Sequence, residues 1–331
     1  MTEQRSSGAT PNRTAVFLGS GTFAVPILEA LLAGAARVRA VVTCPDRPSG
    51  RGRRPHPTPV KQVALEHGLL VLEPERVNAS ESVTALRELA PDLLVTAAYG
   101  QVLSPEILAV PRVAPLNVHP SLLPRYRGAA PVAWVLLRGE HETGVTIIRM
   151  SEEVDGGLLL AQEATPIGED ETAGELEVRL SQLGARLLTE TLGRLTQALA
   201  AARPQGPPPQ DGSARAPKLS TAEGLVDWNR STEEIHNWVR GLNPWPGAHG
   251  FLRHDGGLLR VKLLRVKSRR GRPRRAPGTV VQVSKDVLLV EAADGLVDVR
   301  ELQPAGGRAM AVQAFLRGHQ VREGDRFVGR R

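Results

Sequence analysis

The chain has 331 residues, of which 41% are hydrophobic, and its formal net charge is +7. This length predicts about two domains, and the hydrophobic content is sufficient for packed cores, which excludes a disordered protein. A single cysteine, Cys44, excludes an internal disulfide, and no uncharged apolar run is long enough to span a membrane. We therefore expect a soluble protein of the reducing cytoplasm, whose polar first residues form a tail rather than a signal peptide.

The first 120 residues alternate between apolar strands and helices. Residues 15–34 (AVFLGSGTFAVPILEALLAG) have the pattern of a strand, a glycine turn and a helix, and residues 36–45 that of a second strand. Further strands are predicted at 68–74, 91–100 and 115–119, with helical segments around 63–68 and 81–89. Apolar strands alternating with helices are typical of a mostly parallel sheet that is covered on both faces.

The rest of the chain changes its pattern twice. Residues 144–150 and 156–167 are predicted as strands, and a T-x-x-E capping box at Thr172 and Glu175 begins a helix whose leucines continue to Leu199. A stretch rich in Pro, Gly and Gln follows, and short strands at close spacing, typical of a small β-barrel, come after it. We therefore predict an α/β protein, with a Rossmann-like N-terminal domain (14–202), a linker (203–217) and an OB-like β-barrel domain (218–331).

Positive charge is concentrated in two segments. Arg253 to Arg275 contains ten Arg or Lys residues and one acid, and Arg47 to Lys61 contains five basic residues and no acid. Without these segments the chain would carry a net charge of −7. Two such segments on an otherwise acidic chain favour a surface that meets phosphate, whereas two solvated loops remain the simpler interpretation.

The glycine turn at Gly19 to Ala24 (GSGTFA) matches a dinucleotide-binding pattern. It lies between a strand and a helix, and Asp46 follows at about the expected spacing. Asp46 follows a proline in what is predicted to be a loop, however, and a tight turn that packs the first helix on the sheet explains the pattern equally well. The histidines include no pair with metalloprotease spacing, so we expect no metal site.

Asn117 and His119 stand at the end of a predicted strand. Residues i and i+2 of a strand point to the same side, and active sites of open parallel sheets lie beyond the carboxyl ends of the strands. An amide and an imidazole placed there could stabilise an oxyanion and transfer a proton. Asp155, in a predicted glycine-flanked turn, could orient the ring and stabilise its charged form.

The stretch NVHPSLLPRYRGAAP (117–131), followed by ETGVTI and VDGG, resembles the folate-dependent formyltransferases. The segments PDRPSGRGRRPHPTPVK, AYGQVL, LNPWPGA and LQPAGGRAM extend the resemblance over roughly residues 14 to 325 and favour the members that act on tRNA. The Asn-x-His and SLLP core alone would also fit formyltransferases that act on glycinamide ribonucleotide or on sugar nucleotides.

This resemblance implies an activity and a set of site residues. The donor would be 10-formyltetrahydrofolate, without a metal, and the acceptor would be the α-amine of methionine on initiator Met-tRNA; we expect a monomer. The catalytic residues implied are Asn117, His119 and Asp155. The folate-binding residues implied are Ser121, Leu122, Leu123 and Pro124. For tRNA we expect contacts from Arg51, Arg53, Arg54, Arg269 and Arg270.

Two alternatives from other classes remain open at this point. One is a nicotinamide-dependent dehydrogenase, which depends on the GSGTFA turn alone. The other is a non-catalytic RNA-binding protein with a decayed enzyme domain, against which the intact set of Asn117, His119 and Asp155 argues.

Overall fold

The structure is a computed structural model that describes residues 13–49, 54–254 and 257–329. The chain divides into two compact units. The first comprises residues as far as Ala129 together with Thr143–Thr165 and Glu177–Arg215, and the second comprises Ala130–Glu142, Pro166–Leu176 and the chain from Ala216 onward. The domain boundaries expected from the sequence stay predictions.

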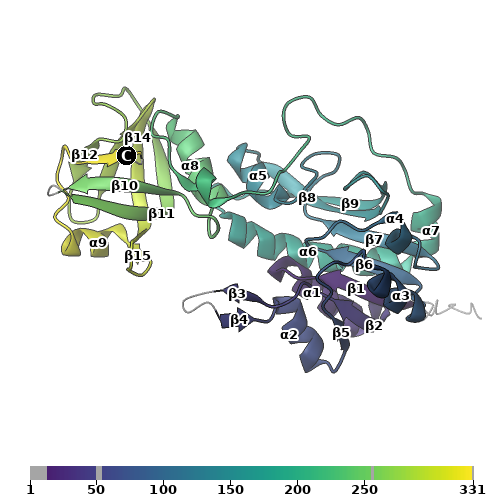
Figure 1. Cartoon of the computed structure of the whole chain (residues 1–331). Helices are drawn as coiled ribbons and strands as arrows, with labels where there is room; N and C mark the ends of the chain where they lie inside the picture. Colours follow the sequence, from purple (N-terminus) through teal and green to yellow (C-terminus); the bar gives the residue numbers. More distant parts are fainter. Residues whose placement is uncertain (1–12, 50–53, 255–256, 330–331) are drawn as a thin grey trace, which may run out of the picture. The chain divides into compact units, whose positions relative to one another are not determined.

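A seven-stranded sheet forms the centre of the first unit (Figure 1). Its order is β5-β2-β1-β6-β7-β8-β9, in which the pairs from β5 to β7 are parallel and β8 runs antiparallel to β7. This is the predicted Rossmann-like, mostly parallel sheet. In chain order its strands are β1 (Thr14–Gly19), β2 (Arg37–Val42), β5 (Leu70–Leu72), β6 (Leu93–Ala97), β7 (Ala114–His119), β8 (Glu142–Arg149) and β9 (Leu158–Pro166).

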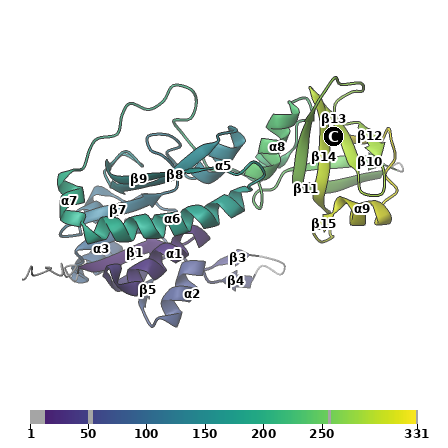
Figure 2. The ribbon, with the colours of Figure 1, turned by 180° about the vertical axis from the view of Figure 1, so that it is seen from behind.

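Helices cover both faces of this sheet. Val16 and Leu18 of β1 belong to an apolar cluster with buried side chains of α3 and α4 on one face. On the other face, α6 approaches so closely that a Cβ on Gly184 would lie 2.9 Å from Cγ1 of Val118; Figure 2 shows this helix running along the sheet. The helices near the sheet are η1 (Thr22–Ala24), α1 (Val25–Ala30), η2 (Leu31–Ala35), α2 (Pro59–Glu66), α3 (Ser80–Glu88), α4 (Pro105–Leu108), α6 (Ala173–Gly193) and α7 (Leu195–Ala200).

The capping box predicted for the long helix is present. Thr172 N and Oγ1 both donate to Glu175 Oε2, at 2.9 and 2.8 Å, and Glu175 N donates back to Thr172 Oγ1 at 3.4 Å. The prediction of one continuous helix as far as Leu199 was wrong, because α6 ends at Gly193 and Leu199 lies in α7. No helix within the described ranges is both long and apolar enough to cross a bilayer.

The first basic segment contains a hairpin that the sequence did not predict. Its strands β3 (Arg47–Ser49) and β4 (Arg54–His56) pair antiparallel. Short strands with proline in both lack the apolar alternation by which strands are recognised. Of the arginines expected to contact tRNA, Arg51 and Arg53 lie outside the described residues, and Arg54 begins β4.

An antiparallel sheet forms most of the second unit. Its order is β12-β13-β14-β11-β10-β16, and β15 pairs with β14. The two ends of this order also approach each other, because Val280 N donates to Asp325 O and Phe327 N donates to Gly278 O, each at 2.8 Å. The sheet therefore curls on itself, as expected for a small barrel domain. Its strands are β10 (His249–His254), β11 (Gly257–Arg270), β12 (Val280–Val283), β13 (Leu288–Ala292), β14 (Gly295–Pro304), β15 (Met310–Ala311) and β16 (Arg326–Val328).

The second unit also contains short helical segments, which are α5 (Pro131–Leu137), η3 (Thr221–Gly224), α8 (Thr232–Gly241) and α9 (Val312–Gly318). The core of this unit gathers the inward side chains of the strands together with Trp228, Phe315 and Phe327. A reciprocal capping box of Ser231 and Glu234 begins α8, whose apolar side pairs Ile235 with Val239.

Candidate active site

Asn117 and His119 occupy the carboxyl end of β7, as predicted. The strand lies between β6 and β8, and His119, its last residue, faces Thr146 across the antiparallel pair. Residues two apart on a strand point to one side of the sheet. His119 is 3% exposed, so the imidazole lies inside the protein with only a small accessible edge.

The carboxylate of Asp155 brings these two side chains together. Its Oδ1 accepts a hydrogen bond from Asn117 Nδ2 at 3.2 Å and lies 3.6 Å from His119 Nδ1. Its Oδ2 accepts from the backbone N–H of Gly128 at 2.9 Å. Asp155 follows β8 in the turn before β9, so three separate segments of the first unit meet at one carboxyl group.

The surroundings of His119 fix its tautomer. Nε2 lies 3.1 Å from the carbonyl oxygen of Tyr126, and a carbonyl can only accept, so Nε2 carries a proton. Nδ1 faces Asp155 at a distance beyond the usual 2.7–3.2 Å range for an N–H···O hydrogen bond. Nδ1 is therefore the ring nitrogen that remains available for chemistry.

Two residues that frame the site have left-handed backbone. The φ angles of Tyr126 and Asp155 are 60° and 53°, a conformation that non-glycine residues seldom adopt and that costs roughly 1–3 kcal/mol. Two residues after Asp155, a Cβ on Gly157 would lie 1.9 Å from the carbonyl oxygen of Arg149, so only glycine fits there. The conformation of the turn that carries Asp155 is thus set by close backbone packing as well as by the hydrogen bonds of the Asp155 carboxylate.

Side chains of β8 and β9 form hydrogen bonds with the backbone of the Ser121 to Pro124 segment. Thr146 Oγ1 donates to Ser121 O at 2.6 Å and accepts from Leu123 N at 3.2 Å, and Gln162 Nε2 donates to Leu123 O at 3.0 Å. Ser121 and Leu123 are buried, whereas Leu122 and Pro124 are only partly covered. Of the four residues expected to bind folate, Leu122 and Pro124 therefore present the side chains that a ligand can reach.

Replacing Thr146 with valine should remove the central support of this segment. The change keeps the shape of a fully buried side chain but leaves Ser121 O and Leu123 N without their partner. We expect a loss of about 1–3 kcal/mol in the free energy of unfolding, measured in urea. Thr143→Val on the same strand is the matched control, because Thr143 Oγ1 is buried without a hydrogen-bond partner among the described residues. Equal losses in the two variants would contradict this role for Thr146.

The GSGTFA turn packs against the sheet. A Cβ on Gly19 would lie 2.7 Å from Phe17 Cε1 and 2.9 Å from Ala97 O, and Ser20 N and Gly21 N both donate to Ala98 O. Asp46, the acidic residue at dinucleotide spacing, forms an ion pair with Lys61 at 2.9 Å. These contacts favour the structural turn over a dinucleotide site.

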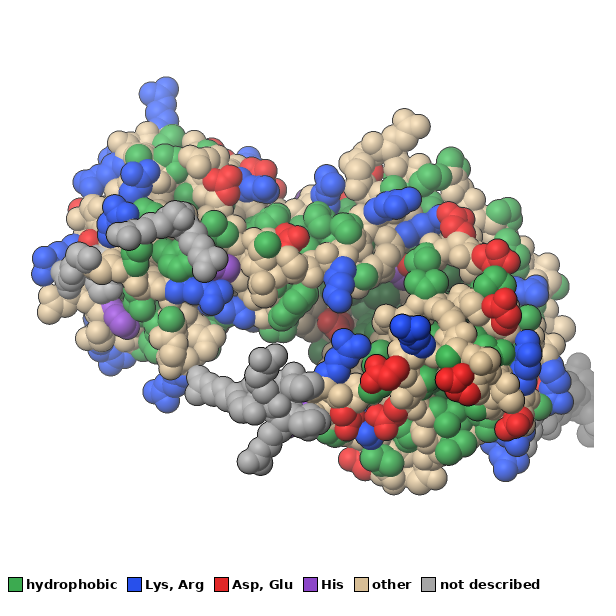
Figure 3. Space-filling view, viewed as in Figure 1, with side chains coloured by type: hydrophobic (Ala, Val, Ile, Leu, Met, Phe, Trp, Pro, Cys, Tyr) green, Lys and Arg blue, Asp and Glu red, His purple; other side chains and the backbone are tan. Residues whose placement is uncertain are grey.

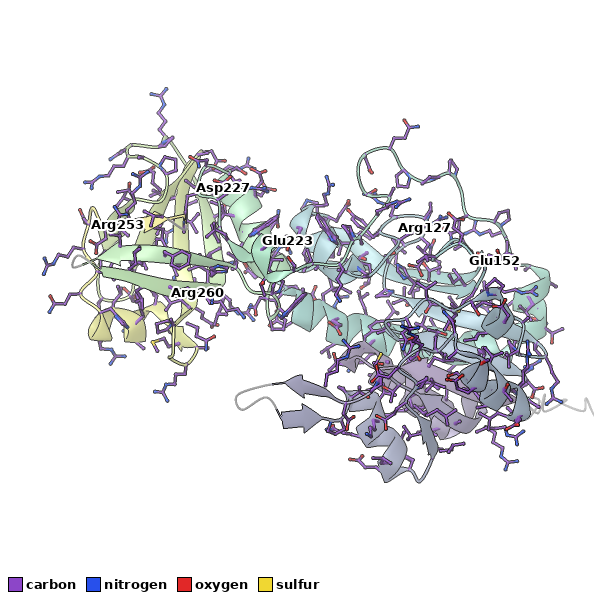
Figure 4. The ribbon with its side chains drawn as sticks, viewed as in Figure 1. Arg127, Glu152, Glu223, Asp227, Arg253 and Arg260 are labelled. Carbon is purple, nitrogen blue, oxygen red and sulfur yellow. The ribbon has the colours of Figure 1, made fainter. Side chains whose placement is uncertain are left out.

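The arginines expected from the second unit are engaged in ion pairs. Arg269 contacts Asp298, whose side chain is fully buried, and Arg270 contacts Glu233. By contrast, Arg253 and Arg260, labelled on neighbouring strands in Figure 4, are exposed and have no acidic partner among the described residues. In the view of Figure 3, the charged surface of this unit is mostly that of Lys and Arg.

Sequence reasoning missed the residues that support the site from outside its motifs. Thr146 could have been noticed as a polar residue inside the apolar run GVTIIR. Arg127 and Gln205, which contact each other beside Asp155, gave no recognisable signal. Within the described residues, no three His, Cys, Asp or Glu side chains lie close enough together to hold a metal ion.

Comparison with known proteins agrees with this geometry. The family described as "Formyl transferase" matches residues 12–192, and "Formyl transferase, C-terminal domain" matches residues 218–320. The chain belongs to the formyl transferase family. Its curated relatives include the "Methionyl-tRNA formyltransferase" of Citrifermentans bemidjiense, 43% identical over 93% of this chain and 94% of that protein. Another, of the same name, is from Halorhodospira halophila, 44% identical over 94% of this chain and 97% of that protein.

Solved structures share the fold at much lower identity. A sugar-nucleotide complex of an N-formyltransferase from Helicobacter canadensis has a TM-score of 0.59 at 16% identity, covering 87% of this chain and 98% of that one. HypX from Aquifex aeolicus, in complex with tetrahydrofolic acid, has a TM-score of 0.60 at 17% identity, covering 96% of this chain and 51% of that one.

Proposed function

We propose that this chain transfers the formyl group of 10-formyltetrahydrofolate to the α-amino group of methionine on initiator tRNA, giving N-formylmethionyl-tRNA. The observation that carries the chemistry is the convergence of Asn117 and His119 on the carboxylate of Asp155 at the end of β7. Relatives that are more than 40% identical over nearly the whole chain and named for this activity support the acceptor.

The reaction begins when the amine nitrogen attacks the formyl carbon and negative charge develops on the formyl oxygen. Asn117 Nδ2 carries two N–H groups and uses one for Asp155, so the second is available to the oxyanion. Because Nε2 of His119 is committed to Tyr126, a protonated Nδ1 is the other donor.

Collapse of the intermediate breaks the bond between the formyl carbon and N10 of the folate. The amine loses one proton and N10 gains one, so the protons balance within the site. Asp155 and Nδ1 of His119, 3.6 Å apart, form the pair that we propose takes the first proton and supplies the second. Leu122 and Pro124 would form part of the wall against the donor.

A transfer assay tests this proposal. The protein is incubated with 10-formyltetrahydrofolate and either initiator or elongator tRNA charged with methionine, and N-formylmethionine is measured after the ester is hydrolysed. We expect formylation of the initiator tRNA and far slower reaction of the elongator. Absence of product with both tRNAs, together with fluorescence changes on addition of NADH, would favour the dehydrogenase instead.

We also propose that the basic segments bind the tRNA, in a monomeric enzyme of the cytoplasm. Arg51, Arg53 and Arg54 would reach the aminoacyl end, and residues of the Arg253 to Arg275 segment would contact the stem. Because Arg269 and Arg270 already contact acids, their phosphate contacts would compete with those pairs. The exposed arginines whose side chains form no ion pair among the described residues are the stronger candidates: Arg253, Arg260, Arg272, Arg274 and Arg275.

Neutralising the loop after β11 should weaken tRNA binding in a salt-dependent way. For the triple change of Arg272, Arg274 and Arg275 to Gln, we expect the slope of log affinity against log salt to fall by about 0.7–0.9 per lost phosphate contact. The matched control changes Arg76, Arg87 and Arg194 to Gln, which removes the same charge from exposed positions of the first unit. If the two triple variants show the same slope, the basic segment is only a solvated loop.

A further inference from the structure

The segment that the sequence assigns to a linker is hydrogen-bonded to the candidate active site. Arg203 pairs with Leu159 of β9 through two backbone hydrogen bonds of 2.8 and 3.1 Å. Ten residues later, Ser213 O accepts from Tyr126 N at 2.6 Å, and the carbonyl of Tyr126 is the one that accepts from His119. Residues 203–215 belong to the same compact unit as the site, and we call them the strap.

Gln205 of the strap holds the turn that carries Asp155. Its Nε2 donates to the carbonyl oxygens of Asp155 and Gly157, at 2.6 and 2.9 Å. Its Oε1 accepts from Arg127 Nε and Nη2, at 3.0 and 2.6 Å. Every hydrogen of this amide nitrogen therefore has a partner, and the amide oxygen accepts twice.

Arg127 also contacts the turn that carries Asp155. Arg127 Nη1 donates to Oε1 of Glu153, two residues before Asp155, at 2.6 Å. The side chain of Arg127 is only 15% exposed. The next residue, Gly128, gives the backbone N–H that binds the Asp155 carboxylate. Gln205 thus ties the segment with Arg127 and Gly128 to the turn with Asp155, and Figure 4 labels Arg127 beside this region.

We propose that Gln205 is a positioning residue for formyl transfer, which sets the place of the Asp155 carboxylate relative to Asn117 and His119. It touches the backbone of Asp155, so it acts through that residue. The left-handed φ of Asp155 persists only where the surroundings hold it, and the two hydrogen bonds from Gln205 are contacts to that backbone. This inference rests on the proposed function for its kinetic consequence, but the placement itself can be measured without turnover.

The kinetic test compares Gln205→Ala with Gln210→Ala. Gln210 is a glutamine of the same strap that is exposed and has no hydrogen-bond partner among the described residues. For Gln205→Ala we expect kcat to fall about 10–100-fold, because a displacement on the order of 1 Å at the reacting groups costs up to about 10²-fold. The KM values for folate and tRNA should stay within about threefold, and Gln210→Ala should behave as wild type.

A double-mutant cycle separates positioning from general support. If Gln205 acts through Asp155, adding Gln205→Ala to an Asp155→Asn enzyme should cost less than about twofold. Losses that multiply in the double variant would overturn the proposal, as would a Gln205→Ala enzyme equal to Gln210→Ala. If Gln205→Ala does not fold, Gln205→Glu decides. Gln205→Glu keeps an acceptor for Arg127, but it places a carboxylate oxygen, which cannot donate, against the carbonyl oxygens of Asp155 and Gly157. A rate within twofold of wild type in this variant would contradict the proposal.

Amide hydrogen exchange at Gly128 gives a readout that does not depend on transfer. This N–H is protected by Asp155 Oδ2, so Gln205→Ala should raise its exchange rate about tenfold, while Gln210→Ala leaves it unchanged. Unchanged protection in Gln205→Ala would overturn the positioning role. Failure of the wild-type protein to formylate any charged tRNA would instead contradict the proposed function and leave this readout intact.

Discussion

An Asp155→Asn enzyme should formylate Met-tRNA at least about 10²-fold more slowly than wild type while it remains folded. A carboxylate accepts at both oxygens, and here it accepts from Asn117 Nδ2 and from Gly128 N. An amide of the same shape has one oxygen and one NH₂ group. In Asp155→Asn the NH₂ group would therefore face one of these two N–H donors, and that hydrogen bond would be lost. The negative charge beside His119 Nδ1 is lost as well. A positioned acid or base typically contributes about 10²–10⁴-fold to the rate.

The control for this change lies in the same turn. Glu152, labelled in Figure 4, is exposed and has no partner among the described residues, so Glu152→Gln removes one negative charge at nearly the same place. The measurements are kcat at a single pH and the urea midpoint of each variant. We expect kcat to fall at least about 10²-fold in Asp155→Asn and to stay within about twofold of wild type in Glu152→Gln. A rate for Asp155→Asn within tenfold of wild type would contradict the role of Asp155.

The parts of the site that the sequence could predict are those set by local geometry. Asn117 and His119 share one side because alternate residues of a strand do so, and apolar runs identified that strand and its neighbours. The carboxyl end of a parallel strand is where such sheets bind ligands, which located the pair. Asp155 could be suggested because a glycine-flanked turn after a strand must lie at a sheet edge. The approach of its carboxylate to both side chains is a tertiary contact that only the structure shows.

The parts that could not be predicted depend on contacts between distant residues. Gln205 lies in a segment rich in Pro and Gly, whose composition is that of a flexible linker. Its side-chain amide nevertheless donates a hydrogen bond to the carbonyl oxygen of Asp155, 50 positions away along the chain. The tautomer of His119 depends on the carbonyl of Tyr126, which reflects the left-handed backbone there. Helix α8 of the second unit is different, because the sequence carries a recognisable start signal for it, the capping box of Ser231 and Glu234. It was not predicted, and its ten residues make it a short helix.

The largest loss is expected for His119→Ala. Removing one oxyanion donor typically costs about 10²–10³-fold in kcat, and this change also removes the ring nitrogen that faces Asp155. We expect a loss of at least that size, with the affinity for charged tRNA, measured by gel shift, within about threefold of wild type. His67→Ala, at an exposed histidine after α2, is the control and should leave both quantities unchanged.

A second substitution at the same position separates the proton-transfer role from the hydrogen bond to Tyr126. In His119→Gln, the amide N–H can still donate to the carbonyl oxygen that Nε2 contacts at 3.1 Å, but no atom of the side chain can exchange a proton near neutral pH. If the ring serves proton transfer through Nδ1, this variant should be nearly as slow as His119→Ala although it is more stable in urea. A His119→Gln enzyme within tenfold of wild type would show that His119 holds the Tyr126 loop and takes no part in the proton balance.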